Sequence, residues 1–289
     1  MQIFILYLLW RLFNTQSNVA IPASEDHSAV NLLRTRIKEN KPEAFARLRE
    51  IFDDQFIHQF FLANARDANK TYEYLESYIY YRITSYPGVL EKFPSVQLKM
   101  LETNNVALLK YRDDEDAMVI LTRAKFWNPA ENPVDDFITQ GTLLVELGFR
   151  IDEKLSETGA VIILDCAELS FWQASYLTPM AVIKGFNLIV SSLPVFPKAI
   201  HVVNGGMLCN MLYNALYPVA KQWIGDKVHI HYGDLSTLHV KVPKAILPVS
   251  LGGELEEHDA FEQDICKMMQ SLIASGYGGY ASVQKTLSS

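Results

Sequence analysis

The first third of the chain carries the spacing of amphipathic helices. Apolar residues recur three or four positions apart, as they do on one face of a helix. Pro87 and Gly88 then interrupt the pattern. We therefore expect an all-helical bundle over residues 28–95. Its apolar stripes are Phe45, Leu48 and Phe52, then Phe56, Ile57, Phe60 and Phe61, and finally Tyr72, Leu75 and Ile79.

The residues before this bundle divide into an apolar run and a polar stretch. The run from Ile3 to Trp10 is shorter than the ~20 residues that span a bilayer. Arg11 follows the run and no basic residue precedes it, which is the reverse of a signal peptide. We expect residues 1–27 to be an apolar segment followed by a linker. The expected localisation is cytoplasmic, and the alternative is secretion or membrane association through residues 1–20.

From residue 96 onward, apolar strand-like runs alternate with helical patterns. The run "GAVIILD" is continuous, as expected of a strand buried on both faces. The alternation predicts an α/β domain with a mostly parallel sheet covered by helices. We place this domain at residues 96–255 and a tail at residues 256–289. The other predicted strands are "MVILT", "AIHVVN" and "KVHIHY", and the helices between them are "VDDFITQGTLLVELGFRI" and "TPMAVIKGFNLIVSSLP".

One further helical segment, from Met207 to Lys221, follows two glycines. Gly205 and Gly206 give its start a permissive hinge, and Pro218 kinks or ends it. An ordinary amphipathic helix packed on the sheet is one interpretation. A hinged lid over an apolar ligand is the other, and methionines would tolerate ligands of varied shape. Its apolar stripe contains Met207, Leu208, Met211, Leu212, Ala215, Leu216 and Val219.

Composition excludes several classes of protein. The net charge of −7 argues against nucleic-acid binding, which requires a basic surface. The three cysteines form no C-x-x-C pair, which disfavours a disulfide framework or a zinc site, and we interpret Cys209 as a small apolar residue. Nucleophile-elbow, Walker A and H-E-x-x-H motifs are all missing. We expect no enzyme activity, no catalytic residue and no cofactor.

Two polar clusters have a metal-binding and a simpler interpretation. His229 and His231 alternate along one predicted strand, and His201 lies on a neighbouring one. They could ligate a metal, but packed sheet histidines are favoured because no carboxylate partner is evident. The acidic run Asp113–Asp116 favours a solvated hairpin tip over a calcium loop, which needs spaced oxygen ligands. We expect no metal.

Six short motifs, in order, resemble the CRAL-TRIO lipid-binding family. The resemblance extends from about residue 28 to residue 255, in the group of tocopherol-transfer and retinaldehyde-binding proteins, with insect members closest. The motifs are "DDQF" from Asp53, "WNP" from Trp127, "GAVIILD", Thr178-Pro179, "LPVFPKAIHVVN" from Leu193, and "IHYGDLSTLHVKVPKAILPVSLGG" from Ile230.

The resemblance implies the site as well as the fold. It implies a helical amino-terminal domain and an apolar pocket closed by the 207–221 helix as a gate, with Gly205 and Gly206 as its hinge. It implies no catalytic residue. The residues it places against lipid are Leu177, Leu188, Leu193, Val195 and Ile200, together with Leu208, Met211, Leu212, Ala215 and Leu216 of the gate.

The basic cleft that some family members use for phosphoinositides is thinned here. Leu62, Phe196 and Trp223 stand at basic positions of the family pattern, while Lys198 and Lys227 remain. Each lost charge removes a charge-assisted contact of about 1.5–3 kcal/mol. Phosphoinositide binding through Lys198 and Lys227 is therefore doubtful.

These observations predict a non-catalytic carrier. It would bind and transfer a small hydrophobic ligand (a retinoid, tocopherol or related lipid), contact membranes transiently, bind no nucleic acid and act as a monomer. The alternative is an interaction or scaffold module that keeps the fold without a lipid.

Overall fold

The structure is a computed structural model, and it describes residues 23–92, 99–152, 154–264, 267 and 271. The predicted apolar run Ile3–Trp10, the third cysteine (Cys266) and most of the tail lie outside these residues. Among the described residues, no helix combines the length and the apolar character that crossing a bilayer requires.

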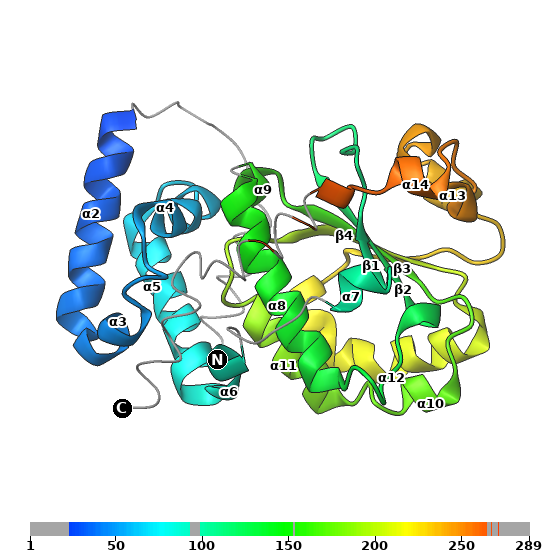
Figure 1. The fold of residues 1–289 in the computed structure, drawn as a ribbon, viewed down its shortest axis with the longest axis horizontal. Helices are drawn as coiled ribbons and strands as arrows, with labels where there is room; N and C mark the ends of the chain where they lie inside the picture. The colour runs from blue at the N-terminus through cyan, green and yellow to red at the C-terminus, as the bar shows by residue number, and fades with distance from the viewer. Residues whose placement is uncertain (1–22, 93–98, 153, 265–266, 268–270, 272–289) are drawn as a thin grey trace.

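Helices build the described residues 23–92, as the periodicity predicted (Figure 1). Asp53 and Asp67 begin two of these helices, because their carboxylates accept hydrogen bonds from backbone N–H groups of the first turn. The Asp53 carboxylate accepts from the N–H of Phe56 at 2.7 Å. The elements are α2 (Ala23–Asn40), α3 (Pro42–Leu48), α4 (Asp54–Ala63), α5 (Ala68–Ile79), the π-helical turn η1 (Tyr80–Ser85) and α6 (Gly88–Lys92).

The first of these helices begins earlier than expected. Residues 23–27 were predicted to belong to a linker because they are polar, but they form the first turns of α2. Asp26 is buried, and its Oδ2 atom lies 3.1 Å from Nε2 of His58 and 3.4 Å from Nε of Arg66. Asp26 is therefore polar because it pairs with the bundle, whereas His27 beside it is exposed.

A five-stranded sheet forms the second part, in the order β1-β2-β3-β4-β5. The edge strand β1 is antiparallel to β2, and the other neighbours are parallel. This confirms the mostly parallel sheet. The strands are β1 (Val106–Leu108), β2 (Met118–Arg123), β3 (Ala160–Asp165), β4 (Pro197–Val203) and β5 (Val228–Ile230).

Helices cover both faces of the sheet (Figure 1). On one face lie α8 (Val134–Ile151), α11 (Pro179–Ile189) and α12 (Gly206–Ile224), with α11 in contact with both neighbours. The other face packs against α13 (Ser236–His239) and the turns that follow it. The shorter elements are α7 (Lys99–Glu102), η3 (Ala124–Phe126), α9 (Leu155–Thr158), α10 (Phe171–Ala174), η4 (Lys244–Ile246), η5 (Val249–Leu251) and α14 (Glu257–Ala260).

The helical part and the sheet part share one core. Phe56 and Phe60 of α4 contact Phe149 of α8 with ring centroids 5.5 and 6.4 Å apart. Arg82 of η1 and Glu146 of α8, both 0% exposed, form an ion pair across the same junction. The predicted boundary at residue 95 stays a prediction, and apolar packing is continuous across it.

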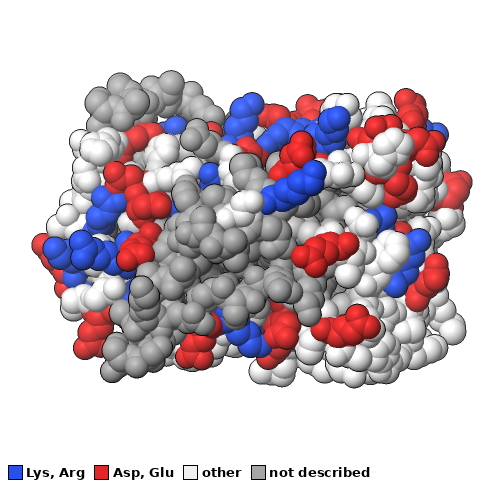
Figure 2. Space-filling view, in the orientation of Figure 1, with Lys and Arg blue, Asp and Glu red and all other residues white. Residues whose placement is uncertain are grey.

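Charged side chains of both signs intermix over the face shown in Figure 2. The lower right of this view, where Figure 1 places α10 and α12, carries few charges. Large apolar side chains are exposed in the same part of the chain, namely Phe171, Trp172, Met180, Met207 and Met211. They follow the carboxyl ends of β3 and β4, which are adjacent parallel strands, so they gather at one edge of the sheet.

Candidate functional site

The two faces of the sheet are filled to different degrees. On the face under α13, five strand side chains are at most 4% exposed and form a packed cluster with Leu238 and Leu251, namely Val119, Leu121, Val161, Ile163 and Val203. On the face under α11 and α12, Ile120, Ile162 and Leu164 keep part of their surface accessible. They lie on interior strands, where a filled core would bury them completely.

The helices over this second face show the same incomplete packing. Of the eleven residues of α11, Leu188 alone is fully buried, although the helix lies between α8 and α12. Val182 and Phe186 of α11, with Tyr217 and Trp223 of α12, pack only partly buried around Ile200. Apolar side chains from the strands and from both helices therefore border accessible space, as expected of a site for an apolar ligand.

The five predicted lipid-contacting residues outside the gate divide into two groups. Leu188, Leu193 and Val195 are buried in the core shared with the helical bundle, together with Met118 and Ala160 at the start of the strands.

The second group lies outside that shared core. Ile200 lies on the face under α11 and α12, in line with Ile162 of β3, and Leu177 is half-buried just before α11. Lipid contact by any of the five stays a prediction.

The predicted gate helix is present, but its apolar stripe does not face the sheet as one unit. Leu208, Leu212 and Leu216 are half-buried, whereas Met207 and Met211 are 76% and 55% exposed. These two methionines, and Ala215, which is also exposed, therefore do not pack on the sheet, and contact of the stripe with lipid stays a prediction.

The buried residues of the helix are Cys209, Ala220 and Ile224, none of which belongs to the predicted stripe. The helix also continues beyond Pro218 to Ile224, so a proline that lacks an N–H does not end it.

The start of α12 is held by close contacts. Asn204, with φ of 54°, donates from Nδ2 to Oδ1 of Asp165 at 2.8 Å. A Cβ at Gly205 would lie 2.9 Å from Cβ of Cys209 and 3.0 Å from its sulfur. Gly206 has a φ of 28°, which favours glycine, and open space around it. Gly205 is therefore required by a close approach and Gly206 by backbone conformation, while their role as a hinge stays a prediction.

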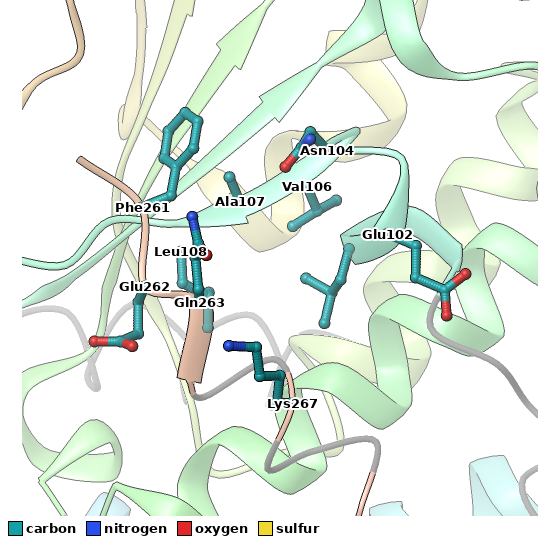
Figure 3. A pocket seen from close by; sticks show the side chains of 10 residues that line it. Glu102, Asn104, Val106, Ala107, Leu108, Phe261, Glu262, Gln263 and Lys267 are labelled. Atoms are coloured by element: carbon teal, nitrogen blue, oxygen red, sulfur yellow. The ribbon is translucent and has the colours of Figure 1, made fainter. Parts of the chain in front are cut away.

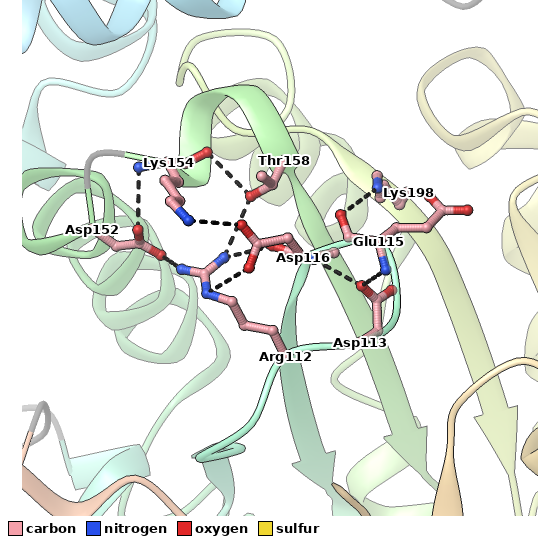
Figure 4. A network of polar contacts seen from close by, with 9 residues as sticks. Arg112, Asp113, Glu115, Asp116, Asp152, Lys154, Thr158 and Lys198 are labelled. Carbon is pink, nitrogen blue, oxygen red and sulfur yellow. Dashed lines mark hydrogen bonds and ion pairs between the residues drawn. The ribbon is translucent and has the colours of Figure 1, made fainter.

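Lys198, the first basic position retained from the family pattern, is already paired (Figure 4). Its Nζ atom lies 2.7 Å from Oε2 of Glu115. This hydrogen bond and the lysine charge lower the pKa of Glu115, because both stabilise the ionised carboxylate.

Glu115 belongs to the acidic run, which forms the tip of the β1–β2 hairpin. Its neighbour Asp116 pairs with Lys154 at 3.1 Å. The run thus supplies counter-charges to basic residues, as a hairpin tip, and its hydrogen bonds are visible in Figure 4.

Lys227, the second retained basic position, faces backbone and an aromatic ring. Its Nζ donates to the carbonyl of Pro197 at 2.7 Å and lies 5.6 Å from the centre of the Phe196 ring. Trp223 stacks on Phe186 at 5.3 Å and donates from Nε1 to Ser191 at 2.8 Å. Two positions that are basic in the family pattern, Phe196 and Trp223, therefore take part in aromatic packing.

The three strand histidines lie together, as their alternation predicted. Nδ1 of His201 lies 2.9 Å from Nε2 of His231, and the rings of His201 and His229 stack at 5.3 Å. Burial, and then the neighbouring imidazoles, lower the pKa of His201 to about 4. In the described part of the chain, no group of three or more His, Cys, Asp or Glu side chains is placed to hold a metal. His201 and His231 are thus hydrogen-bonded to each other, and burial also lowers the pKa of His231.

A separate hollow of about 540 Å³ lies beside the edge strand β1 (Figure 3). Strand residues Val106 and Leu108 form one wall, and the segment at Phe261 forms another. Charged side chains, including Glu102, Glu262 and Lys267, also border it. It was not anticipated from the sequence, and its charged rim differs from the apolar lining under α11 and α12.

The family model for the CRAL/TRIO domain matches residues 102–253, which is more than half of the 289 residues. The chain belongs to the CRAL/TRIO domain family. At the level of the family, its relatives are lipid-binding and lipid-transfer proteins. The likeness to insect members expected from the sequence stays a prediction.

Curated relatives of this CRAL/TRIO protein cover most of the chain. The alpha-tocopherol transfer protein-like protein of Homo sapiens is 27% identical over 231 residues, which is 80% of this chain and 66% of the relative. Clavesin-1 of Xenopus laevis is 25% identical over 210 residues, or 72% and 63% of the two chains. The CRAL/TRIO chain thus spans less than two thirds of the length of these relatives.

A solved structure supports the fold of the CRAL/TRIO chain. The crystal structure of Sfh5 superposes with a TM-score of 0.54, covering 89% of this chain and 100% of the other. At 13% identity, this likeness establishes the fold alone.

Proposed function

We propose that this protein binds and transfers a small hydrophobic ligand, of the retinoid, tocopherol or related lipid class, and catalyses no reaction. The ligand would lie between the sheet and the helices α11 and α12, and α12 would act as the gate. Membership of the CRAL/TRIO family supports lipid binding in general. The name of the human relative, alpha-tocopherol transfer protein-like, supports the suggested lipid class.

The observation that carries the proposal is the partial exposure of Ile162 and Leu164 on an interior strand. Apolar surface that stays in contact with water forgoes about 25 cal/mol for every Å² left unburied. A lipid that covers this surface would recover that free energy. The packed opposite face does not offer such a gain, because Val161 and Ile163 are already buried.

Native mass spectrometry of the full chain, purified from a lipid-rich host, tests the proposal. We expect one co-purified lipid per protein, which is released on denaturation. Protein that is uniformly empty, and that also fails to take up retinoid or tocopherol offered in vesicles, would contradict it. That outcome would favour the scaffold interpretation.

We predict that Leu164→Trp lowers lipid uptake at least severalfold without lowering thermal stability. The larger ring would occupy accessible space on the ligand face. Its neighbour Ile163 faces the packed side and provides the matched control. Ile163→Trp should overpack that core and cost about 1–3 kcal/mol. Lipid uptake and thermal melts of both variants measure the difference, and equal loss of stability in the two would contradict the assignment of the faces.

The exposed apolar residues at the carboxyl edge of the sheet support a transient membrane contact. Phe171 and Met180 are 68% and 70% exposed, and they lie at the same edge as Met207 of the gate. Aromatic and apolar side chains can enter the interfacial region of a bilayer. Basic residues should contribute little to this membrane contact, because Lys198 already pairs with Glu115.

We predict vesicle binding that depends little on salt or on phosphatidylinositol bisphosphate. Each basic residue near an anionic surface contributes about 1 kcal/mol, and the retained lysines are engaged within the protein. Co-sedimentation with vesicles that contain or lack this lipid, at low and high salt, measures the effect. Trp172→Ser should weaken binding, whereas Lys198→Gln should not. Binding that requires the phosphoinositide and disappears in salt would refute the prediction.

A further inference from the structure

Two cysteines lie next to each other at the root of α12. Cys166 directly follows β3, and Cys209 lies in the first turn of α12. Their sulfur atoms are 3.3 Å apart, and both thiols are free. A disulfide requires about 2.05 Å between the sulfurs, so a small movement of the side chains would allow the bond to form.

The backbone around the pair is built for this approach. The N–H of Cys166 donates to the carbonyl of Val203 at 3.0 Å, which ties the end of β3 to β4. The N–H of Cys209 donates to the carbonyl of Gly205 at 3.1 Å. A side chain at position 205 would meet the Cys209 sulfur. The missing Cβ of Gly205 therefore leaves room for Cys209 beside Cys166.

The surroundings suit oxidation of one member of the pair. Cys166 is half-buried, so a small oxidant reaches it, while Cys209 is 9% exposed. The hydrogen bond between the thiols lowers the pKa of Cys209, against the opposing effect of burial. The same pairing raises the pKa of Cys166. The thiol with the lowered pKa is thus Cys209 and the more exposed thiol is Cys166, so thiolate character and access are divided between two touching sulfurs.

We propose that Cys166 and Cys209 form a reversible disulfide in response to peroxide, and that this bond locks α12 against the sheet. The locking effect rests on the proposed function of α12 as a gate. The formation of the bond does not.

The reaction consumes one hydrogen peroxide for each disulfide. One thiolate attacks a peroxide oxygen, the O–O bond breaks, and the sulfur becomes a sulfenic acid as hydroxide leaves and takes up a proton. The second thiol attacks that sulfur, the S–S bond forms, and the sulfenic hydroxyl leaves as water. The two sulfurs lose two electrons to the peroxide, and a dithiol reductant reverses the reaction.

The bond would join the end of a central strand to the first turn of the gate helix. In the reduced protein, that turn is held by hydrogen bonds such as that between Asn204 and Asp165, which open and close locally. A covalent link at the same place would prevent the turn from leaving the sheet. We therefore expect the oxidised protein to exchange its ligand more slowly.

The first measurement is chemical. The full chain is treated with hydrogen peroxide or with a dithiol, and peptides are mapped without reduction. We expect a peptide pair linked through Cys166 and Cys209, with the loss of two hydrogens in the intact mass. Cys166→Ser and Cys209→Ser should each abolish the link, whereas Cys266→Ser should retain it. Oxidation of these thiols to separate sulfinic acids, or a link to Cys266, would overturn the proposed site.

The second measurement concerns the gate. Transfer of a fluorescent lipid from the loaded protein to vesicles should slow by about tenfold on oxidation, because gate opening limits release, and should recover with dithiol. Hydrogen exchange at the first turns of α12 should slow in parallel, with or without lipid. Unchanged hydrogen exchange in linked protein overturns the lock. Slowed exchange in a protein that carries no lipid in either state supports the lock and contradicts the carrier function instead.

Discussion

Replacing Arg82 with methionine is expected to lower the free energy of unfolding by about 3–5 kcal/mol. The Arg82 guanidinium donates to Oε1 of Glu146 at 2.7 and 2.9 Å and to Oγ of Ser192 at 2.8 Å. Arg82 and Glu146 are completely buried. Removal of the arginine leaves the Glu146 carboxylate without a counter-charge in a core where ionisation is costly. Equilibrium unfolding in urea measures the loss.

Two controls separate the buried charge from loss of side-chain volume. The double replacement Arg82→Met with Glu146→Leu should recover much of the loss, because it removes both charges together. Lys154→Ala breaks the solvent-exposed pair with Asp116 and should cost less than about 1 kcal/mol. A loss for Arg82→Met no larger than that for Lys154→Ala would contradict the prediction.

Leu212→Asp is expected to abolish retention of a bound lipid while the overall fold persists. Leu212 is half-buried on α12, and a carboxylate there would lie against apolar surface, at a cost of several kcal/mol. The adjacent Met211 is 55% exposed, so Met211→Asp supplies a matched control with the same added charge. Retention of a fluorescent lipid and circular dichroism of both variants measure the effect.

The two substitutions should also separate retention from membrane contact. Met211→Asp should retain lipid yet bind vesicles more weakly, because its side chain lies on the exposed apolar edge. Equal loss of retention in both variants would show that the exposed methionines enclose the ligand, as the stripe first suggested. Unchanged retention in both would remove α12 from the site.

The fold could be predicted because it depends on local patterns. Stripes such as Phe56 and Phe60 mark helix faces in any context, and runs such as "GAVIILD" mark strands covered by helices. The prediction of a linker at residues 23–27 failed, because side chains distant in the sequence decide whether this segment packs as a helix. The polar turn at Asp26 resembles a linker until His58 and Arg66 are placed beside it.

The site could be predicted only in outline. The run "GAVIILD" was expected to be buried on both faces, and its composition does not distinguish Val161 and Ile163, which are fully packed, from Ile162 and Leu164, which are not. Whether a strand side chain is buried depends on the helices that pack against its face of the sheet, and the strand's own sequence does not specify them. In the same way, the sequence retains Lys198, but it does not show that Glu115, 83 positions away, pairs with this lysine.

The contact between Cys166 and Cys209 was also missed. The spacing of 43 residues carries no signal by itself. A signal was nevertheless present: Cys166 follows one predicted strand of the parallel sheet, and Cys209 follows the next. Adjacent parallel strands end at the same edge, so residues just beyond them meet.

The buried junction at Arg82 has a consequence for how the molecule comes apart. Severed from the helical bundle, the sheet would expose Phe149 and leave Glu146 without its arginine, and the bundle would lose the wall against which Phe56 and Phe60 pack. Neither part keeps a closed core alone. The helices that precede the CRAL/TRIO domain therefore complete its core, and the helical part and the domain should unfold together in a single cooperative thermal transition.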